Sequence, residues 1–400
     1  MDKASDNASI GGQGGRIAPG YIGRVSRLQA SLSEAGVKAA VLTTQGTITY
    51  YSGAFCPWRS ALVLGQTGEP TLITMAYDAH RIRTLTWVNE VVGSQASSRS
   101  GFVARIVSAL RDRGINEGAV GVELETGLVP GVITAREMLD LQEALPQIRL
   151  RNVSDEAQEI MVIKEDYEIE QMRRAAEIAD VGVQAGFNAL RPGISEFSLT
   201  GIVEHAMRDA GDMFTWSVTG NEIASGYRQC YPVCATVIPS NKIIQYGDVV
   251  TIDIHPTTLS GYRSDLALNA VIGPPSDSIK RLADNWAEIV RAEIGALKPG
   301  RTVNDVACDV EDAIKKLKLE PRWTYTVGGH GLGTEARMPP TIRKRDERRL
   351  RPRTVVVLAV FLIDPGIAGM RLELPVLLTE SGNEVLCKTP LKLHVACPSY

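Results

Sequence analysis

Two aspartates, a histidine and a glutamate in the second half of the chain constrain its fold more than any other feature. Asp253 ends a strand-like apolar run, and Asp265 follows 12 positions later (265 − 253), after a glycine-containing turn. His330 lies between glycines, and Glu373 lies in a later strand-like run. Carboxylate oxygens and imidazole nitrogens together suit a divalent first-row metal ion. The pattern predicts a metal site built by strands that are distant in sequence.

The composition is that of a globular protein with two domains. The chain has 400 residues, too many for one ordinary core, and 22% of them are charged, with a formal net charge of −3. With charges so nearly balanced, the protein has no overall positive potential to attract nucleic acid or an acidic membrane, so we expect neither partner. We find no signal peptide or membrane-length apolar run. Six scattered cysteines favour reduced thiols and a cytoplasmic location.

The order of patterns along the chain predicts an α/β protein in three parts. Residues 1–20 are polar and glycine-rich and are expected to be a flexible tail. Residues 21–155 mix helical patterns with β-rich runs and are expected to form a small domain. Residues 156–400 begin with a long amphipathic helix and are expected to form the second domain. The β-rich runs of the first domain include 39–43, 48–51, 61–64 and 71–74.

A repeated phrase suggests that the second domain is duplicated. Ala-Leu-Arg-Pro-Gly at 189–193 matches Ala-Leu-Lys-Pro-Gly at 296–300, an offset of 107 residues (296 − 189). Each copy ends one predicted helix and leads into another, which β-rich sequence follows. We therefore expect two α/β halves that face each other and form a cleft between two sheets.

Several motifs cover nearly the whole chain and resemble one family. They lie at 36–42 with 48–53, at 161–169, at 247–253 and at 329–333. They resemble the creatinase, prolidase and aminopeptidase P family, the M24-type "pita-bread" metallopeptidases. The resemblance implies a small N-terminal creatinase-like α/β domain followed by a pita-bread domain of two duplicated α/β halves. It also implies a homodimer whose N-terminal domain reaches the active site of the partner subunit.

The resemblance gives each of the four residues a role in a hydrolase that acts on a small molecule. Asp253, Asp265, His330 and Glu373 correspond to metal ligands, which would hold one or two ions of Mn, Zn, Co or Fe. His330 and Glu373 would also take part in catalysis. In creatinase-like members the metal is dispensed with, so a metal-free site is the alternative.

The chain departs from the family at a further glutamate, expected between the histidine and the last glutamate. A placement without gaps puts Ala359 there, 14 residues before Glu373 (373 − 359). In the alternative placement, a shifted motif makes Asp364 a shorter metal ligand. We favour Ala359, because spacings within a buried sheet resist slippage.

Two family histidines that hold the scissile amide and move protons are also replaced, by Arg337 and Thr236. Metal-activated water needs a general base, which the absent glutamate would have been. These replacements argue against ordinary peptide hydrolysis.

Further candidates are side chains near the expected site. His255 lies two residues after Asp253, so both share a face of a strand, and it could be a proton carrier or a ligand. Trp216, Tyr227 and Arg337 lie where this family binds substrate. Arg59 resembles a loop residue that reaches the partner's site, where a guanidinium suits a substrate carboxylate. For each of these residues, an ordinary structural role is the alternative.

The function that we predict is hydrolysis of a C–N bond, amide or amidine-like, in a small amino-acid-like substrate. His330 would be the acid/base, beside a residual metal site. The alternatives are a metal-assisted lyase or cyclase, an Xaa-Pro dipeptidase or aminopeptidase, and a non-catalytic binding protein on the same fold.

Overall fold

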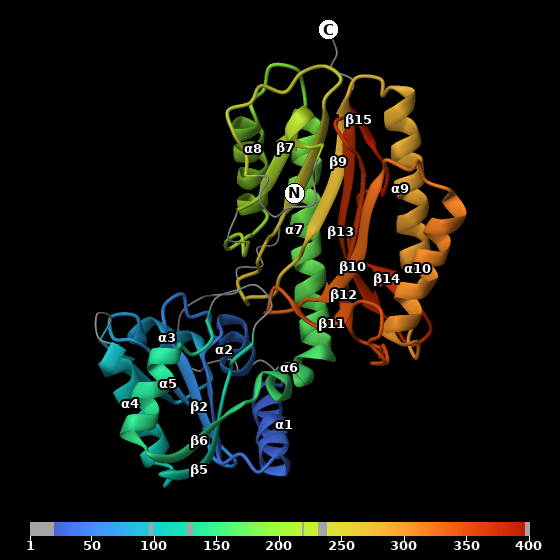
Figure 1. The fold of residues 1–400 in the computed structure, drawn as a ribbon. Coiled ribbons are helices and arrows are strands. Elements are labelled where there is room, and N and C mark those ends of the chain that lie inside the picture. The colour runs from blue at the N-terminus through green and yellow to red at the C-terminus, as the bar shows by residue number, and fades with distance from the viewer. Residues whose placement is uncertain (1–19, 96–98, 126–130, 218–219, 231–237, 397–400) are drawn as a thin grey trace, which may run out of the picture.

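The computed structural model describes residues 20–95, 99–125, 131–217, 220–230 and 238–396 (Figure 1). Apart from Gly20, the expected tail lies outside the described residues. Two bodies are visible, an N-terminal domain and a larger C-terminal domain that carries the long helix α7 (Figure 1). The predicted α/β architecture with a creatinase-like and a pita-bread domain is confirmed.

The N-terminal domain is built around a six-stranded sheet of order β4-β3-β2-β1-β5-β6. Its two faces are covered by separate apolar clusters, one of which includes buried residues of α1 and α6 and the other those of α4 and α5. The elements are α1 (Tyr21–Glu34), β1 (Ala39–Leu42), α2 (Gln45–Ser52), β2 (Ala61–Gly65), β3 (Thr71–Met75), α3 (Ala79–Leu85), β4 (Glu90–Ser94), α4 (Arg99–Arg111), β5 (Glu117–Val122), α5 (Ala135–Ala144), β6 (Gln147–Asn152) and α6 (Ser154–Val162).

Residues 48–51 belong to helix α2, so the strand that we predicted there is wrong. The Thr44 side chain caps this helix by accepting a hydrogen bond from the backbone N–H of Thr47. Buried Glu123 accepts hydrogen bonds from two backbone N–H groups at the start of the helix, and Gly53 ends it with φ of 76°. Capping and burial on nearly all sides thus override the β propensity of the sequence.

The C-terminal domain contains two similar helix pairs, α7 with α8 and α9 with α10, as the repeated phrase predicted. Each copy of the phrase starts at the last residue of the first helix in its pair. The elements are α7 (Asp166–Ala189), α8 (Glu196–Asp209), β7 (Glu222–Ser225), a 3-10 turn (Gly226–Arg228), β8 (Val249–Ile254), β9 (Leu266–Ile272), α9 (Asp277–Ala296), α10 (Val303–Leu317), β10 (Thr324–Gly331), β11 (Met338–Ile342), β12 (Val355–Asp364), β13 (Ala368–Leu378), β14 (Asn383–Val385) and β15 (His394–Ala396).

The strands of both halves join in one sheet, which corrects our expectation of two facing sheets. Its main order is β11-β10-β12-β13-β9-β8-β7, with β14 paired to β13 and β15 paired to β9. The halves meet where β13 pairs antiparallel with β9, at Glu373 opposite Ala267. The seam between the halves therefore runs through a predicted site residue.

The two domains meet around α6 and the start of α7. Helix α6 spans the expected boundary at 155 and packs its buried residues into the N-terminal core. The fully buried guanidinium of Arg24 binds Glu165 and donates a hydrogen bond to the hydroxyl of Tyr262 in the C-terminal domain. These buried contacts fix one domain on the other. In the part of the chain that the structure describes, no helix is long and apolar enough to span a membrane.

Candidate active site

Strand register places five residues in one line across the C-terminal sheet. The line runs through Glu222, Asp253, Ala267, Glu373 and Ala359 on neighbouring strands. Residues that are paired side by side in a sheet point to the same face. The small side chain of Ala267 leaves room between the carboxyl groups on either side of it.

Gly328 extends this line, because it pairs with Ala359. Four further polar side chains reach the same face, because each lies two residues along the chain from a residue of the extended line. They are Asp265, His255, Arg371 and His330. All of them are buried, with at most 6% of each residue exposed. The sheet therefore gathers four acids, two histidines and one arginine away from solvent.

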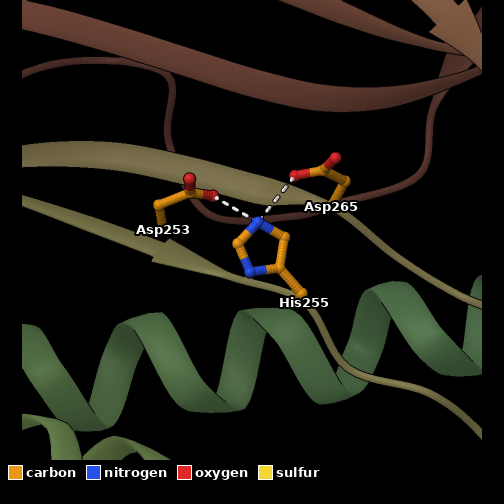
Figure 2. A group of neighbouring side chains, drawn as sticks. All are labelled: Asp253, His255 and Asp265. Atoms are coloured by element: carbon orange, nitrogen blue, oxygen red, sulfur yellow. Dashed lines mark ion pairs between the residues drawn. The ribbon is translucent and has the colours of Figure 1, made fainter. Parts of the chain in front are cut away.

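One group of ligand-type atoms lies around His255 (Figure 2). Its Nε2 atom lies 3.3 Å from Oδ1 of Asp253 and 3.7 Å from Oδ1 of Asp265. Neither oxygen receives a hydrogen bond, so the ring nitrogen points between the two carboxylates rather than at one of them (Figure 2).

A second group lies on the other side of Asp265. The Nε2 atom of His330 lies 3.8 Å from Oδ2 of Asp265, and Glu373 completes the group, with all ligand atoms within 4.8 Å of one another. Asp265 thus faces one imidazole with each of its two oxygens.

Backbone carbonyl groups orient both imidazole rings. Nδ1 of His255 lies 3.2 Å from the carbonyl oxygen of Gly220, and Nδ1 of His330 lies 3.1 Å from that of Gly331. A carbonyl oxygen only accepts, so each Nδ1 carries the hydrogen, and in a neutral ring Nε2 then presents a lone pair. Burial lowers the pKa of His255 to about 4 and that of His330 to about 3, which keeps both rings neutral near pH 7.

Arg371 is the cation inside the cluster. Its guanidinium donates to Glu222 at 2.8 Å, contacts Asp253 closely and lies 3.6 Å from Glu373. The same group lies over the ring of Phe361, which faces the site from β12. One arginine cannot balance four carboxyl groups, and Asp265 makes no ion pair with it at all.

Burial raises the pKa values of three of these acids. Burial raises the pKa of Asp253 to about 6 and that of Glu373 to about 7, although Arg371 opposes both shifts. Burial, and then the charges of Glu373 and Asp253, raise the pKa of Asp265 well above its usual range. Atoms without a hydrogen-bond partner include Oδ1 of Asp265, Nε2 of His330 and Oε2 of Glu373. Such lone pairs fit a cation, which can be coordinated by several of them at once.

The structure does not bring Asp364 to this group, which corrects the alternative in which it is a ligand. Asp364 ends β12 five residues after Ala359, so it lies roughly 16 Å along the strand and on the opposite face. Both of its oxygens bind Arg322, each at 2.8 Å. Ala359 instead pairs with Glu373, as the placement without gaps requires, and it is partly exposed although both of its neighbours are buried.

The predicted substrate-binding residues are placed differently from one another. Trp216 packs edge-on against His255, with ring centroids 4.7 Å apart, and donates a hydrogen bond to the carbonyl of Ser264. Arg337 is exposed, and its charge lowers the pKa of Asp253, Asp265 and Glu373, so it lies near the buried cluster.

Two other predicted residues do not join the cluster. Tyr227 is 75% exposed beside Lys242. Arg59 binds Glu137 and the carbonyl of Gly131 within its own domain, so several of its donors are already engaged. The substituted family position Thr236 lies outside the described residues.

Comparison with known proteins agrees with this arrangement. Residues 170–380 match metallopeptidase family M24, and residues 24–163 match the creatinase/prolidase N-terminal domain. The chain belongs to family M24. This confirms the family that the motifs predicted and, with it, the predicted class, a hydrolase.

Relatives extend over most of this M24 chain. An uncharacterised hydrolase/peptidase of Sinorhizobium fredii is 27% identical over 94% of this chain and 96% of its own. An Xaa-Pro dipeptidase of Pyrococcus horikoshii is 28% identical over 69% of this chain and 76% of its own. The solved structure of an Xaa-Pro dipeptidase from Bacillus anthracis is 26% identical, with a TM-score of 0.81, and covers 94% of this chain and 99% of its own.

Two members of the cluster escaped the sequence analysis. Arg371 lies in the motif that carries Glu373, and the two-residue period of a strand would have placed both on one face. Glu222 gave no such signal, because only the pairing of β7 with β8 brings it beside Asp253.

Proposed function

We propose that this M24 chain hydrolyses a C–N bond, amide or amidine-like, in a small amino-acid-like substrate, with the help of a divalent metal ion. The observation that carries the proposal is the buried group of acids and imidazoles whose lone pairs face one another without donors. Buried carboxylates in such numbers need a counter-charge, and Arg371 supplies only one.

The donor set fits a divalent cation. Oδ1 of Asp253 and Oδ1 of Asp265 accept no hydrogen bond, and neutral imidazole nitrogens flank these carboxylates. A metal ion bound there would act as a Lewis acid and would lower the pKa of a coordinated water. The remaining steps belong to the side chains.

Glu373 is the group that we assign to proton transfer. A general base works best when its pKa lies near the working pH, and burial raises the pKa of Glu373 to about 7. It would take a proton from the attacking water and give it to the leaving nitrogen. His330, whose pKa is lowered to about 3, is better suited to hold that water by accepting a hydrogen bond at Nε2. This division revises our expectation that His330 is the acid/base.

Substrate access is supported by the exposure of Ala359. This residue lies beside Glu373 on the same face, and both it and its partner Gly328 are partly exposed. Alanine in place of a longer acid leaves space there, next to the candidate base. Arg337 is exposed near the same carboxyl groups, where its guanidinium could bind the carboxylate of an amino-acid-like substrate.

The experiment is a substrate screen with purified full-length protein. Xaa-Pro dipeptides and amino acids that carry an amide or amidine group are incubated with Zn²⁺, Co²⁺ or Mn²⁺, and released amine is measured by mass spectrometry. We expect release from at least one non-peptide compound, and its loss by a factor of about 100 or more in Glu373→Gln. Glu384→Gln, at a partly exposed glutamate on β14 that pairs with Arg173 away from the cluster, is the matched control. Release that is equal in Glu373→Gln and the parent would refute the role of Glu373.

We expect a cytoplasmic homodimer, and the unpaired thiols of Cys56, Cys230, Cys308 and Cys387 support a reducing compartment.

A further inference from the structure

We propose that His255 is a metal ligand, which together with Asp253 and Asp265 holds a single divalent ion with a preference for zinc or cobalt. This inference deepens the proposed function and rests on it, because it places the ion that assists hydrolysis. His255 then binds the metal, Glu373 transfers protons, and His330 holds the attacking water.

The spacing of the three ligand atoms fits one small ion. Ligand atoms about 2.1 Å from a tetrahedral ion lie roughly 3.4 Å from one another. Nε2 of His255 lies 3.3 Å from Asp253 and 3.7 Å from Asp265, close to that separation on both sides. The three residues are at least 96% buried, so the atoms that face one another are held in place.

The surroundings of His255 prepare its ring for coordination. Nδ1 is engaged by the carbonyl of Gly220, which leaves the lone pair of Nε2 directed between the carboxylates. The backbone N–H of His255 donates to Asn221, and Trp216 packs against the ring. Hydrogen bonds and packing of this kind orient metal-bound histidines in general. A hydrogen bond from Nε2 to either carboxylate would explain the contacts without a metal, but neither oxygen accepts one.

The other group of ligand-type atoms is less suited to the ion. Nε2 of His330 lies 3.8 Å from Asp265, whereas Nε2 of His255 lies 3.3 Å from Asp253, which is nearer to the separation that one ion requires. Ala359 supplies no donor at the position next to Glu373. Arg371 approaches one oxygen of Glu373 and one of Asp253, so Oε2 and Oδ1 both stay available, but only Oδ1 of Asp253 lies 3.3 Å from an imidazole nitrogen. Three protein ligands with an open position are the usual pattern of a catalytic zinc site.

The ligand types set the choice of metal. A site made only of carboxylates suits Mg²⁺ or Mn²⁺, whereas an imidazole nitrogen shifts the preference toward Zn²⁺ and Co²⁺. The presence of His255 between two aspartates therefore predicts that zinc binds this chain more tightly than manganese does.

The test measures metal binding without reference to catalysis. Metal-free full-length protein is titrated with Zn²⁺, Co²⁺ and Mn²⁺ by calorimetry, and bound metal is counted by elemental analysis after dialysis. Trp216 adds an optical probe, because its ring contacts His255 and its fluorescence should be quenched by Co²⁺. A Trp216→Phe protein identifies that part of the signal. The variants are His255→Ala, His255→Cys and His330→Ala. The matched control is His205→Ala, at a histidine of α8 whose side chain is exposed.

We expect one equivalent of Zn²⁺ in the parent, in His205→Ala and in His330→Ala. His255→Ala should lose affinity by more than the roughly 100-fold that follows loss of an outer hydrogen-bond partner. His255→Cys should keep zinc and give cobalt a thiolate absorption band, which only a direct ligand produces. Circular dichroism confirms that each variant is folded.

Opposite outcomes separate the two proposals. The ligand assignment would be overturned if His255→Ala kept the zinc affinity and cobalt quenching of the parent, or if His330→Ala lost the ion instead. The proposed function would still stand in either case, provided that the parent hydrolyses a substrate. A zinc site that depends on His255, in a protein that releases no amine from any compound, would support the assignment and overturn the proposed function.

Discussion

Glu293 offers a prediction in which both the size and the sign of an effect follow from the structure. It lies on the buried face of α9, is only 1% exposed, and neither of its carboxyl oxygens has a hydrogen-bond partner. Burial, and then the charge of Glu373, raise its pKa well above the usual value of 4.5. The folded protein therefore keeps Glu293 protonated at a pH where the unfolded chain has released that proton.

The sign of the pH dependence follows from this difference. Below pH 4.5 Glu293 is protonated in both the folded and the unfolded state, so its titration does not change the free energy of unfolding there. As the pH rises from there toward the raised folded value, the free energy of unfolding falls by about 1.4 kcal/mol per pH unit because of this residue alone. An unpartnered buried polar group costs a further 1–3 kcal/mol, roughly, at any pH.

Two substitutions separate these contributions. Glu293→Gln removes the titration but keeps a polar group, so stability should fall less steeply with pH than in the parent. Glu293→Met removes both effects, so it should stabilise the protein by about 1–3 kcal/mol near pH 4.5 and by about 1.4 kcal/mol more for each pH unit from there toward the raised folded pKa. A cavity of about 150 Å³ beside Glu293 gives methionine room to adjust. Glu288→Gln on the same helix, where the side chain is 55% exposed, is the control and should change little.

The assay is urea unfolding between pH 5 and 8, followed by tryptophan fluorescence. Asp253, Asp265 and Glu373 also have raised pKa values, but they are common to all of these proteins, so differences from the parent isolate Glu293. Parallel stability curves for the parent and Glu293→Gln would refute the reasoning, because they would mean that Glu293 titrates alike in both states.

Three other perturbations have defined outcomes. Arg371→Met should destabilise the metal-free protein by about 3–5 kcal/mol in the same unfolding assay, because it leaves buried acids without their cation, and a change under 1 kcal/mol would contradict this. Asp364→Asn should leave zinc content unchanged, since Asp364 binds Arg322 away from the cluster, and lost zinc by elemental analysis would restore it as a ligand. Light scattering should give twice the chain mass of 43.3 kDa for the parent, and a monomer would refute the predicted homodimer.

The sequence predicted the site better where a motif was local than where a contact was made by the sheet. Asp253, Asp265, His330 and Glu373 stand in short glycine-containing or strand-like contexts that carry the resemblance, and the structure brings all four together. The placement without gaps singled out Ala359, and strand pairing sets this residue opposite Glu373.

The predictions that failed depended on tertiary contacts. Residues 48–51 have β propensity but form a helix, because the cap at Thr44 and the buried carboxylate of Glu123 stabilise its first turn. Glu222 became visible only through the pairing of β7 with β8. Glu293 is a charged residue within the apolar stripe of α9, where a helical pattern would place an apolar side chain.

The seam at β9 has a consequence for how the chain is made. One edge of β9 pairs with β8, and the other pairs with β13 at Ala267 and with β15 at 270–272. Both partners on that second edge are encoded late, since β13 starts 96 positions after the end of β9 (368 − 272). At ordinary translation speeds the ribosome needs roughly 5–20 s to make that stretch. During this time the nascent first half presents a bare strand edge, which invites pairing with other chains. Chaperones that cover such strand edges during synthesis should therefore raise the yield of folded chain. We expect this gain to exceed the gain from refolding the complete chain more slowly.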